Sequence, residues 1–389
     1  VGKGANSVAG KTVLGETALD ASVSGGNNTA IGKDALTALT SGENNVAVGA
    51  LALDANTTAT GNTAVGKSSL SANTTGASNT AVGGGALLAN TTASNNTAVG
   101  KNALTANTTG TNNVAVGQAS LDACTEGNHN TAVGTESLSA NTTGNNNSAV
   151  GRQCMLLNTT GDNNTALGQE ALEANTTASN NTAIGFEALN ANTTGTRNVA
   201  VGSAALDANT TADDNTAVGS TSLSANTTGH SNVAVGSGSM SSCTTGAQNI
   251  AMGKNSLDAL TEANNSIALG NNAGGAITTG NDNTVIGSNA LAAVTTGTSN
   301  VAVGRSALTN STASANTAIG YQALQSNTNG TDNVAVGFGA LDANTTGDRL
   351  TAVGLNALGG STTSDNNTAV GYQALLSNTT GSENTAVGS

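Results

Sequence analysis

The chain has no proline and no tryptophan among its 389 residues, and only two tyrosines and two phenylalanines. Its apolar fraction is 37%, whereas an ordinary globular domain reaches about 45–50%. A single thick hydrophobic core therefore cannot form. The lack of proline, and of a glycine at every third residue, excludes a collagen triple helix.

Long apolar runs are also missing. No stretch approaches the roughly 18 consecutive apolar residues that a membrane-spanning helix needs, and the N-terminus lacks a basic segment followed by an apolar one. We therefore expect neither a membrane span nor a signal peptide in this chain.

Charged residues make up only 8% of the chain, and they sum to a net charge of −13. The acidity is spread thinly, without an acidic or basic block, and this disfavours nucleic-acid binding. His129 and His230 are the only histidines, and no Ser/His/Asp or Cys/His set recurs beside them. We therefore expect no enzyme, no catalytic residue, no cofactor and no metal site.

One repeated unit accounts for nearly the whole sequence. Asn96–Gly100 reads N-T-A-V-G, and the ten residues that follow read K-N-A-L-T-A-N-T-T-G. We call the glycine that closes N-T-A-V-G the landmark glycine and number each repeat from it, so that position −1 precedes it and position +1 follows it. Landmark glycines recur every 17 residues from Gly15 to Gly304, once after 16 residues at Gly320, and then every 17 residues to Gly388.

A fixed short period of this kind is the signature of stacked structural repeats. It predicts one continuous array instead of several globular domains. We divide the chain into an irregular start of the array, residues 1–14, and a continuous array of 17-residue repeats, residues 15–389.

The residues before the landmark glycine predict a short strand. Position −1 is always aliphatic or methionine, and position −3 is mostly threonine or valine. This alternation indicates a strand whose β-branched face points to a core. Position −2 is alanine in every coil except at Val13 and Val285. We interpret this second face as covered too, approached so closely that only alanine fits, which is typical of a parallel sheet.

The residues after the landmark glycine predict a turn and a return. Alanine or serine at position +3 and leucine at position +4 lie among helix formers, as in Gln169–Ala174, so we expect one short helical or 3₁₀ turn, with a second strand as the alternative. Asn-Thr-Thr-Gly then makes the return. Its asparagines are expected to form amide ladders along the stack, at Asn56, Asn73, Asn90, Asn107 and Asn141. The same triplets are N-glycosylation sequons, as at Asn56, Asn107 and Asn192.

Together these elements predict an all-β fold: a parallel β-solenoid, or β-roll, of about 22 coils with a 17-residue period. At about 4.8 Å per coil the stack would be on the order of 105 Å long. Because the buried strip is thin, we expect the chain to self-associate as a homotrimer or filament, with the alanine face at the contact. Cys124 and Cys243 share position +7 seven coils apart, and Cys154 stands at position +3, so no intrachain disulfide is expected.

The closing motif resembles that of a known family. Asn44–Gly49, N-N-V-A-V-G, and Asn6–Gly10, N-S-V-A-G, are similar to the N-S-V-A-I-G signature of YadA-type trimeric autotransporter adhesin heads. The full unit also resembles repeats of phage tail fibres and other bacterial surface fibres. The resemblance covers essentially the whole chain and implies an extracellular, elongated, homotrimeric β-roll. The adhesin repeat is shorter and lacks the A-L-x-A-N-T-T insert, and their heptad stalk and membrane anchor have no counterpart here.

These observations favour a structural and adhesive extracellular fibre, a rigid repetitive rod that acts as a spacer and a multivalent surface on a cell or virion. The alternatives are a phage tail-fibre shaft and a glycan- or ice-binding solenoid. The expected partner is another copy of the chain, and a host-surface glycan or protein is the other candidate.

One local feature stands out from the repeat. All four aromatic residues occupy position +1, which in most other coils holds a polar residue such as Lys, Arg, Gln or Ser and should face solvent. Phe186 stands alone, whereas four successive coils carry large apolar residues there: Tyr321, Phe338, Leu355 and Tyr372. We name these four the aromatic stripe. We expect an exposed apolar surface that serves as a lateral contact or a stacking platform for glycan; chance tolerance on the side of the rod is the alternative.

Overall fold

The computed structural model describes residues 9–389, and the chain divides into two compact units, one ending at Thr196 and the other beginning at Arg197. The predicted fold class is confirmed, because the chain is an all-β parallel β-solenoid of about 22 turns with a period of about 17 residues. Residues 1–8 of the expected irregular start, and with them most of the Asn6–Gly10 motif, lie outside the described residues.

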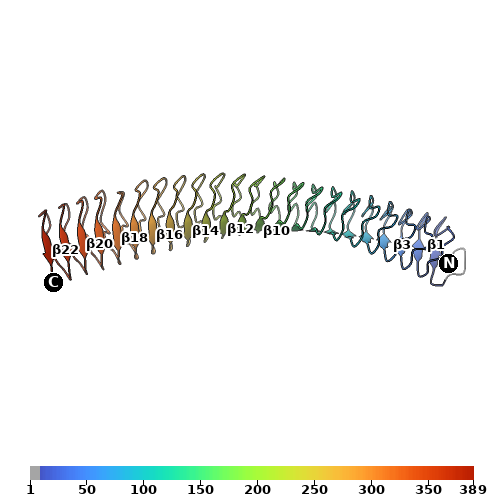
Figure 1. The fold of residues 1–389 in the computed structure, drawn as a ribbon, viewed down its shortest axis with the longest axis horizontal. Coiled ribbons are helices and arrows are strands. Elements are labelled where there is room, and N and C mark those ends of the chain that lie inside the picture. Colours follow the sequence, from blue (N-terminus) through green and yellow to red (C-terminus); the bar gives the residue numbers. More distant parts are fainter. Residues whose placement is uncertain (1–8) are drawn as a thin grey trace. The chain divides into compact units, whose positions relative to one another are not determined.

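The first unit contains one strand per coil, and the strands follow one another in sequence order (Figure 1). They are β1 (Thr12–Leu14), β2 (Thr29–Ile31), β3 (Val46–Val48), β4 (Thr63–Val65), β5 (Thr80–Val82), β6 (Thr97–Val99), β7 (Val114–Val116), β8 (Thr131–Val133), β9 (Ser148–Val150), β10 (Thr165–Leu167) and β11 (Thr182–Ile184).

The second unit repeats the arrangement. Its strands are β12 (Val199–Val201), β13 (Thr216–Val218), β14 (Val233–Val235), β15 (Ile250–Met252), β16 (Ile267–Leu269), β17 (Thr284–Ile286), β18 (Val301–Val303), β19 (Thr317–Ile319), β20 (Val334–Val336), β21 (Thr351–Val353), β22 (Thr368–Val370) and β23 (Thr385–Val387).

Neighbouring strands within a unit pair in parallel, each residue opposite its equivalent one coil away. In β6 and β7, Ala98 pairs with Ala115 and Val99 with Val116. The register holds even at the 16-residue coil, where Ala302 pairs with Ala318. Hence the missing residue is absorbed in the return, not in the sheet.

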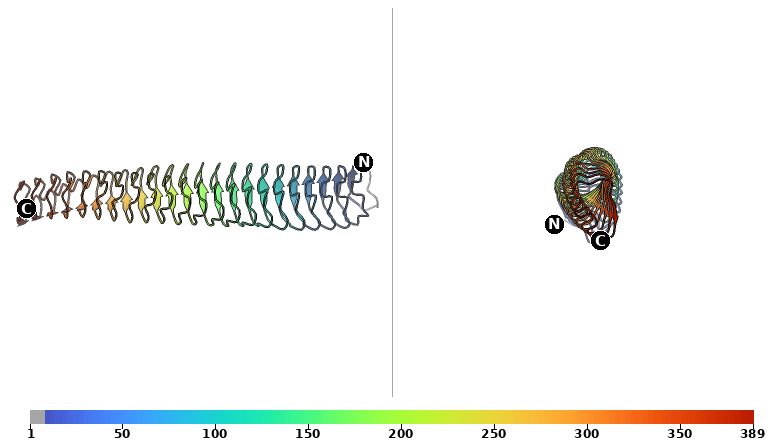
Figure 2. Two further views of the ribbon diagram at one scale, coloured as in Figure 1. Left: turned by 90° about the horizontal axis from the view of Figure 1, so that it is seen from above. Right: turned by 90° about the vertical axis from the view of Figure 1, so that its left-hand side faces the viewer.

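Hydrogen bonds join consecutive coils beyond the strands as well. The Gly100 amide donates back to the Val82 carbonyl at 2.8 Å, whereas the Leu104 amide donates forward to Ser120 at 2.9 Å. Main-chain groups in the Leu-bearing segment therefore bond to the coils on either side, as they do in a sheet. Figure 2 shows the resulting succession of like coils, each with its strand on one side.

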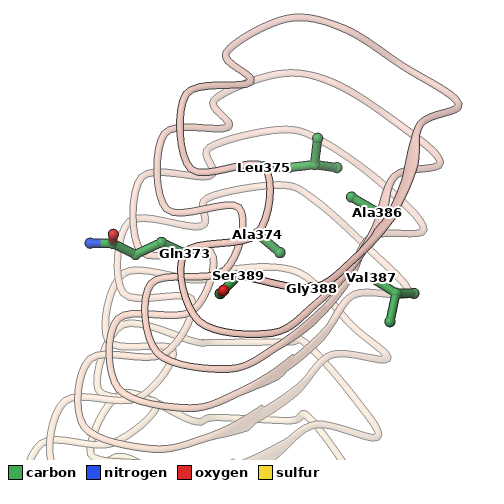
Figure 3. Close-up of a pocket in the computed structure, with 7 residues that line it drawn as sticks. All are labelled: Gln373, Ala374, Leu375, Ala386, Val387, Gly388 and Ser389. Atoms are coloured by element: carbon green, nitrogen blue, oxygen red, sulfur yellow. The ribbon is translucent and has the colours of Figure 1, made fainter.

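The orientation of the strands corrects the prediction from the alternation. The alanines at position −2 point into the coil and are fully buried, as Ala98 and Ala115 show, whereas Val99 at position −1 is 37% exposed. The β-branched residues face outward, and the alanine column is the inner wall of the coil. Figure 3 shows this for β23, where Ala386 points toward Leu375 inside the coil and Val387 points away from it.

The interior of each coil is narrow because side chains from the strand and from the opposite, Leu-bearing wall both point into it. The inner columns are asparagine at −4, alanine at −2, alanine or serine at +3, leucine at +4, asparagine at +7, and glycine or alanine at +10. Ser137 at position +3 donates its hydroxyl to the Ala149 carbonyl of the next strand at 3.1 Å. Such close approach favours alanine on the inner face of the strand, and Val13 and Val285 are the two larger residues buried at this position.

The expected helical turn at the leucine is also wrong, since residues 9–389 contain no helix. The residues at positions +2 and +4 instead take the left-handed backbone conformation, with φ of 58° at Asn102 and 51° at Leu104. This conformation is unfavourable for leucine. It is offset by complete burial of the Leu104 side chain and by the hydrogen bonds to the neighbouring coil. Tertiary packing thus overrides the helix propensity of these residues.

The landmark glycine is required by the spacing of the coils. Gly100 has a φ of 140°, and a Cβ placed on it would lie 2.3 Å from the Gly117 carbonyl oxygen of the next coil. Any side chain at this corner would collide with main chain that itself takes part in the ladder.

The predicted asparagine ladders are confirmed at position +7. The Asn90 side-chain amide donates to the Asn73 side-chain oxygen at 2.9 Å, and the Asn107 amide donates to Asn90 at 2.8 Å. A second column, at position −4, links coils differently. The side-chain oxygen Oδ1 of Asn96 accepts a hydrogen bond from the main-chain N–H of Asn113 at 2.9 Å. The side-chain nitrogen Nδ2 of Asn96 donates to the Gly110 carbonyl at 2.9 Å. Both columns are buried and lock each coil to the next.

Candidate contact surface

The outward side of each strand forms a surface that we call the strand face, made of positions −3 and −1. Position −1 carries only aliphatic side chains or methionine, and many are more than one-third exposed. Examples are Val65 36%, Val82 37% and Val99 37% in the first unit, and Met252 44%, Ile286 38% and Ile319 40% in the second. Position −3 carries threonine, serine, valine or isoleucine, so strands β1–β23 present no charged side chain on this face.

Exposed aliphatic residues scattered singly are ordinary on proteins, but a contiguous row is not. In-register pairing places each position −1 residue beside its equivalent, as Val82 beside Val99 and Val99 beside Val116. Each unit therefore carries a continuous apolar row along its strands. Sequence analysis missed this surface because it assigned the same side chains to the core.

The aromatic stripe lies beside the strand face in the second unit. Its members are exposed: Tyr321 38%, Phe338 52%, Leu355 42% and Tyr372 55%. Only the landmark glycine separates position −1 from position +1, so no side chain stands between Ile319 and Tyr321 along the chain. The stripe therefore broadens the apolar surface over these coils. Phe186, in the first unit, is 46% exposed.

Two rings of the stripe stack on each other. The centroids of Tyr321 and Phe338 are 5.2 Å apart, with an interplanar angle of 22°. One face of each ring is thus covered by its neighbour.

The histidines and cysteines are placed as isolated residues. His129 and His230 are both exposed and belong to different units; the Nε2 of His129 lies 3.4 Å from the Asn112 side-chain nitrogen. The three cysteines are buried with free thiols. Burial raises the pKa of Cys124 to about 11 and those of Cys154 and Cys243 to about 12, so these thiols stay protonated and poorly reactive at neutral pH.

The asparagines of the sequons are not surface residues. Asn56, Asn107 and Asn192 are fully buried in the position +7 column. An attached glycan would have to pass out through the closely packed interior of the coil. N-glycosylation at these positions is therefore incompatible with the folded coil.

The solenoid opens into a pocket at its C-terminal end (Figure 3). Its lining consists of Gln373, Ala374, Leu375, Ala386, Val387, Gly388 and Ser389. Three of these residues belong to columns that face inward in all the remaining coils: Ala374, Leu375 and Ala386. The pocket is thus the interior of the coil that contains Gln373 to Ser389, and not a separate binding cavity on the side of the stack.

Within residues 9–389, no group of three or more His, Cys, Asp or Glu side chains is placed to hold a metal ion. The same residues contain no helix with the length and hydrophobicity needed to cross a membrane. Fold and surface together define a parallel β-solenoid repeat protein. No protein-family model matches the chain, and no curated protein matches it.

Proposed function

We propose that the protein is a structural and adhesive extracellular fibre, in which stacked coils form a stiff spacer and a repeated surface. The observation that carries this proposal is the regularity of the coil-to-coil bonding. Strand pairs keep one register, and asparagine columns run through the interior beside them. Load applied along the stack is then shared by parallel hydrogen bonds in every coil, as suits a mechanical element.

The surface supports the adhesive part of the proposal. Each coil repeats the same outward residues, so a weak contact made by one coil is multiplied along the stack. The resemblance to adhesin-head and tail-fibre repeats points to the same setting, at the surface of a cell or a virion. In this proposal the chain works as a self-associated assembly, a homotrimer or a filament, and a tail-fibre shaft would use the same mechanics.

Force spectroscopy on a single tethered chain tests the mechanical role. We expect the chain to resist extension and then lengthen in steps as groups of coils open. Smooth extension at the low force typical of an unstructured polypeptide would contradict the proposal.

Light scattering or native mass spectrometry tests the assembly. A mass three times that of the 37.1 kDa chain is expected for the homotrimer, and large polydisperse species for a filament. A monomer at all concentrations would refute self-association while leaving the force measurement to decide the mechanical role.

A further inference from the structure

We propose that the strand face is the surface through which copies of this chain meet, sheet against sheet, parallel and with equivalent coils side by side. This inference rests on the proposed function, because it presupposes that the fibre self-associates. It relocates the contact from the alanine column, which is buried inside each coil, to the aliphatic column beside it.

The first argument is electrostatic. Copies with a net charge of −13 repel one another unless they meet through a neutral surface. The strand face of β1–β23 carries no charged side chain, whereas acidic residues occupy exposed positions elsewhere on the coil, as Glu126 and Asp214 do. The neutral strip is therefore the place where two copies can approach closely.

The second argument concerns the period of the surface. Aliphatic rows recur once per coil, at the strand spacing of about 4.8 Å, along the strands of each unit. A globular partner would cover only a few of these rows. Another copy of the solenoid has the same spacing, so its rows pack between or against these over the full length of a unit. Among candidate occupants, only a second copy uses the whole row.

The third argument is area. With twelve strands in the second unit, the strand face there is about 55 Å long, and two outward columns make it about 10 Å wide. That corresponds to roughly 550 Å² per copy, against about 800 Å² per partner in a stable interface. One unit alone supplies about two-thirds of that area, and each of the two units carries such a face. The aromatic stripe adds further apolar area in the second unit.

The length of the row supplies a reason for one particular register. When equivalent coils lie side by side, every strand of a unit in one copy faces a strand of the other copy. A shift by one coil leaves one strand at each end without a partner, so the equal register buries the most apolar surface.

Cysteine cross-linking tests both the face and the register. We choose Val99→Cys on the strand face of the first unit and Val370→Cys on that of the second, which are 37% and 36% exposed in the native chain. The matched control is Thr92→Cys, an exposed residue of the return in the same coil as Val99. The native thiols are buried and will not compete.

Under mild oxidation, Val99→Cys and Val370→Cys should each give covalent dimers, whereas Thr92→Cys should stay uncrosslinked. Both strand-face variants can self-link only when copies are parallel and in register. Cross-linking of the control alone, or of neither strand-face variant in a chain that is oligomeric by mass, would overturn the inference.

A charge substitution supplies a second readout. Val99→Glu should raise the concentration needed for half-assembly by at least about tenfold, because copies would bury like charges opposite one another. Thr92→Glu should leave assembly unchanged, since Glu126 and Glu262 stand naturally at that position of other coils. If the folded Val99→Glu variant assembles as readily as the unmodified chain, the strand face is not the contact surface, although self-association itself would stand. A monomeric unmodified chain refutes self-association itself and removes the basis of this inference.

Discussion

Asn107 and Cys124 occupy position +7 in consecutive coils, and the buried side-chain oxygen of Asn107 has no hydrogen-bond partner in the part of the chain that the structure describes. In neighbouring coils the next asparagine supplies that bond, as Asn107 does for Asn90. Cysteine cannot supply it, so the ladder breaks there. The same break recurs at Asn226, whose successor in the column is Cys243.

Restoring the ladder should stabilise the fold. Cys124→Asn gives Asn107 its missing donor in a column already shaped for asparagine, and we expect a gain of about 1 kcal/mol in the free energy of unfolding. Thermal or urea unfolding measures it. Cys154→Ala is the control, because alanine is usual at position +3 and no ladder is repaired there. An equal gain in both variants would assign the effect to loss of the thiol.

The landmark glycine predicts a steep penalty for the smallest side chain. Gly100→Ala places a methyl group 2.3 Å from the Gly117 carbonyl oxygen, at a φ of 140°. We expect a loss of about 3 kcal/mol or more, or failure to fold. The control is Gly84→Ala at position +1, where the nearest atom to the added Cβ is 4.0 Å away. Thermal unfolding compares the two, and equal melting temperatures would show that the coils can separate to admit the methyl group.

Partly buried aspartates at position +5 should make stability depend on pH. Burial raises the pKa of Asp207, as it does those of Asp54, Asp258 and Asp342. The folded chain then binds protons more tightly than the unfolded chain, so stability rises as pH falls through the raised pKa toward 3.8 and levels off below it. Asp207→Asn should stabilise the chain at neutral pH, and the advantage should shrink at acid pH. The measurement is the melting temperature against pH.

The pKa of Asp214 is shifted in the opposite direction to that of Asp207, so its effect on stability has the opposite dependence on pH. The Arg197 guanidinium, which donates from Nε to the Asp214 carboxylate at 2.6 Å, lowers the pKa of that carboxyl. Its contribution is present above pH 3.8 and is lost as pH falls through the lowered pKa. Asp214→Asn should therefore never stabilise the chain at neutral pH. The same sign for both variants would contradict burial as the cause at Asp207.

The aromatic stripe predicts a coupled loss of stability and assembly. Tyr321→Ser with Phe338→Ser removes a stacked pair worth about 0.5–1.5 kcal/mol beyond its burial and should also weaken bundling in light scattering. Serine stands naturally at position +1 in other coils, as at Ser203, so the coil tolerates it. Phe186→Ser serves as the control, since its neighbours in the column are Gln169 and Ser203. Unchanged bundling in the double variant would remove the stripe from the contact surface.

Several features could be inferred from the chain before any coordinates. The 17-residue period, the landmark glycines and the asparagine columns lead to a parallel stack with in-register side-chain ladders, because like residues recur at one spacing and stacking brings them together. The absence of an intrachain disulfide follows from the same period, because it places the three cysteines several coils apart or in different columns. The aromatic stripe could be located too, since position +1 is polar in most coils and Tyr321, Phe338, Leu355 and Tyr372 break that pattern in succession.

The sequence by itself thus determined the repeat, the parallel strands and the stacked columns, because these depend only on period and spacing. The tertiary structure alone decided which strand face is inside. The alternation in a T-A-V strand is the same whether alanine or the threonine and valine pair points into the coil. The face with the larger aliphatic side chains is usually the one that packs in a core. Closure of the coil reverses this, because Leu104 and Asn107 from the opposite wall leave room only for Ala98 and turn Val99 outward. The same closure holds Leu104 in a left-handed turn instead of a helix, since its main-chain amide donates to the Ser120 carbonyl of the next coil and not to a carbonyl of its own coil.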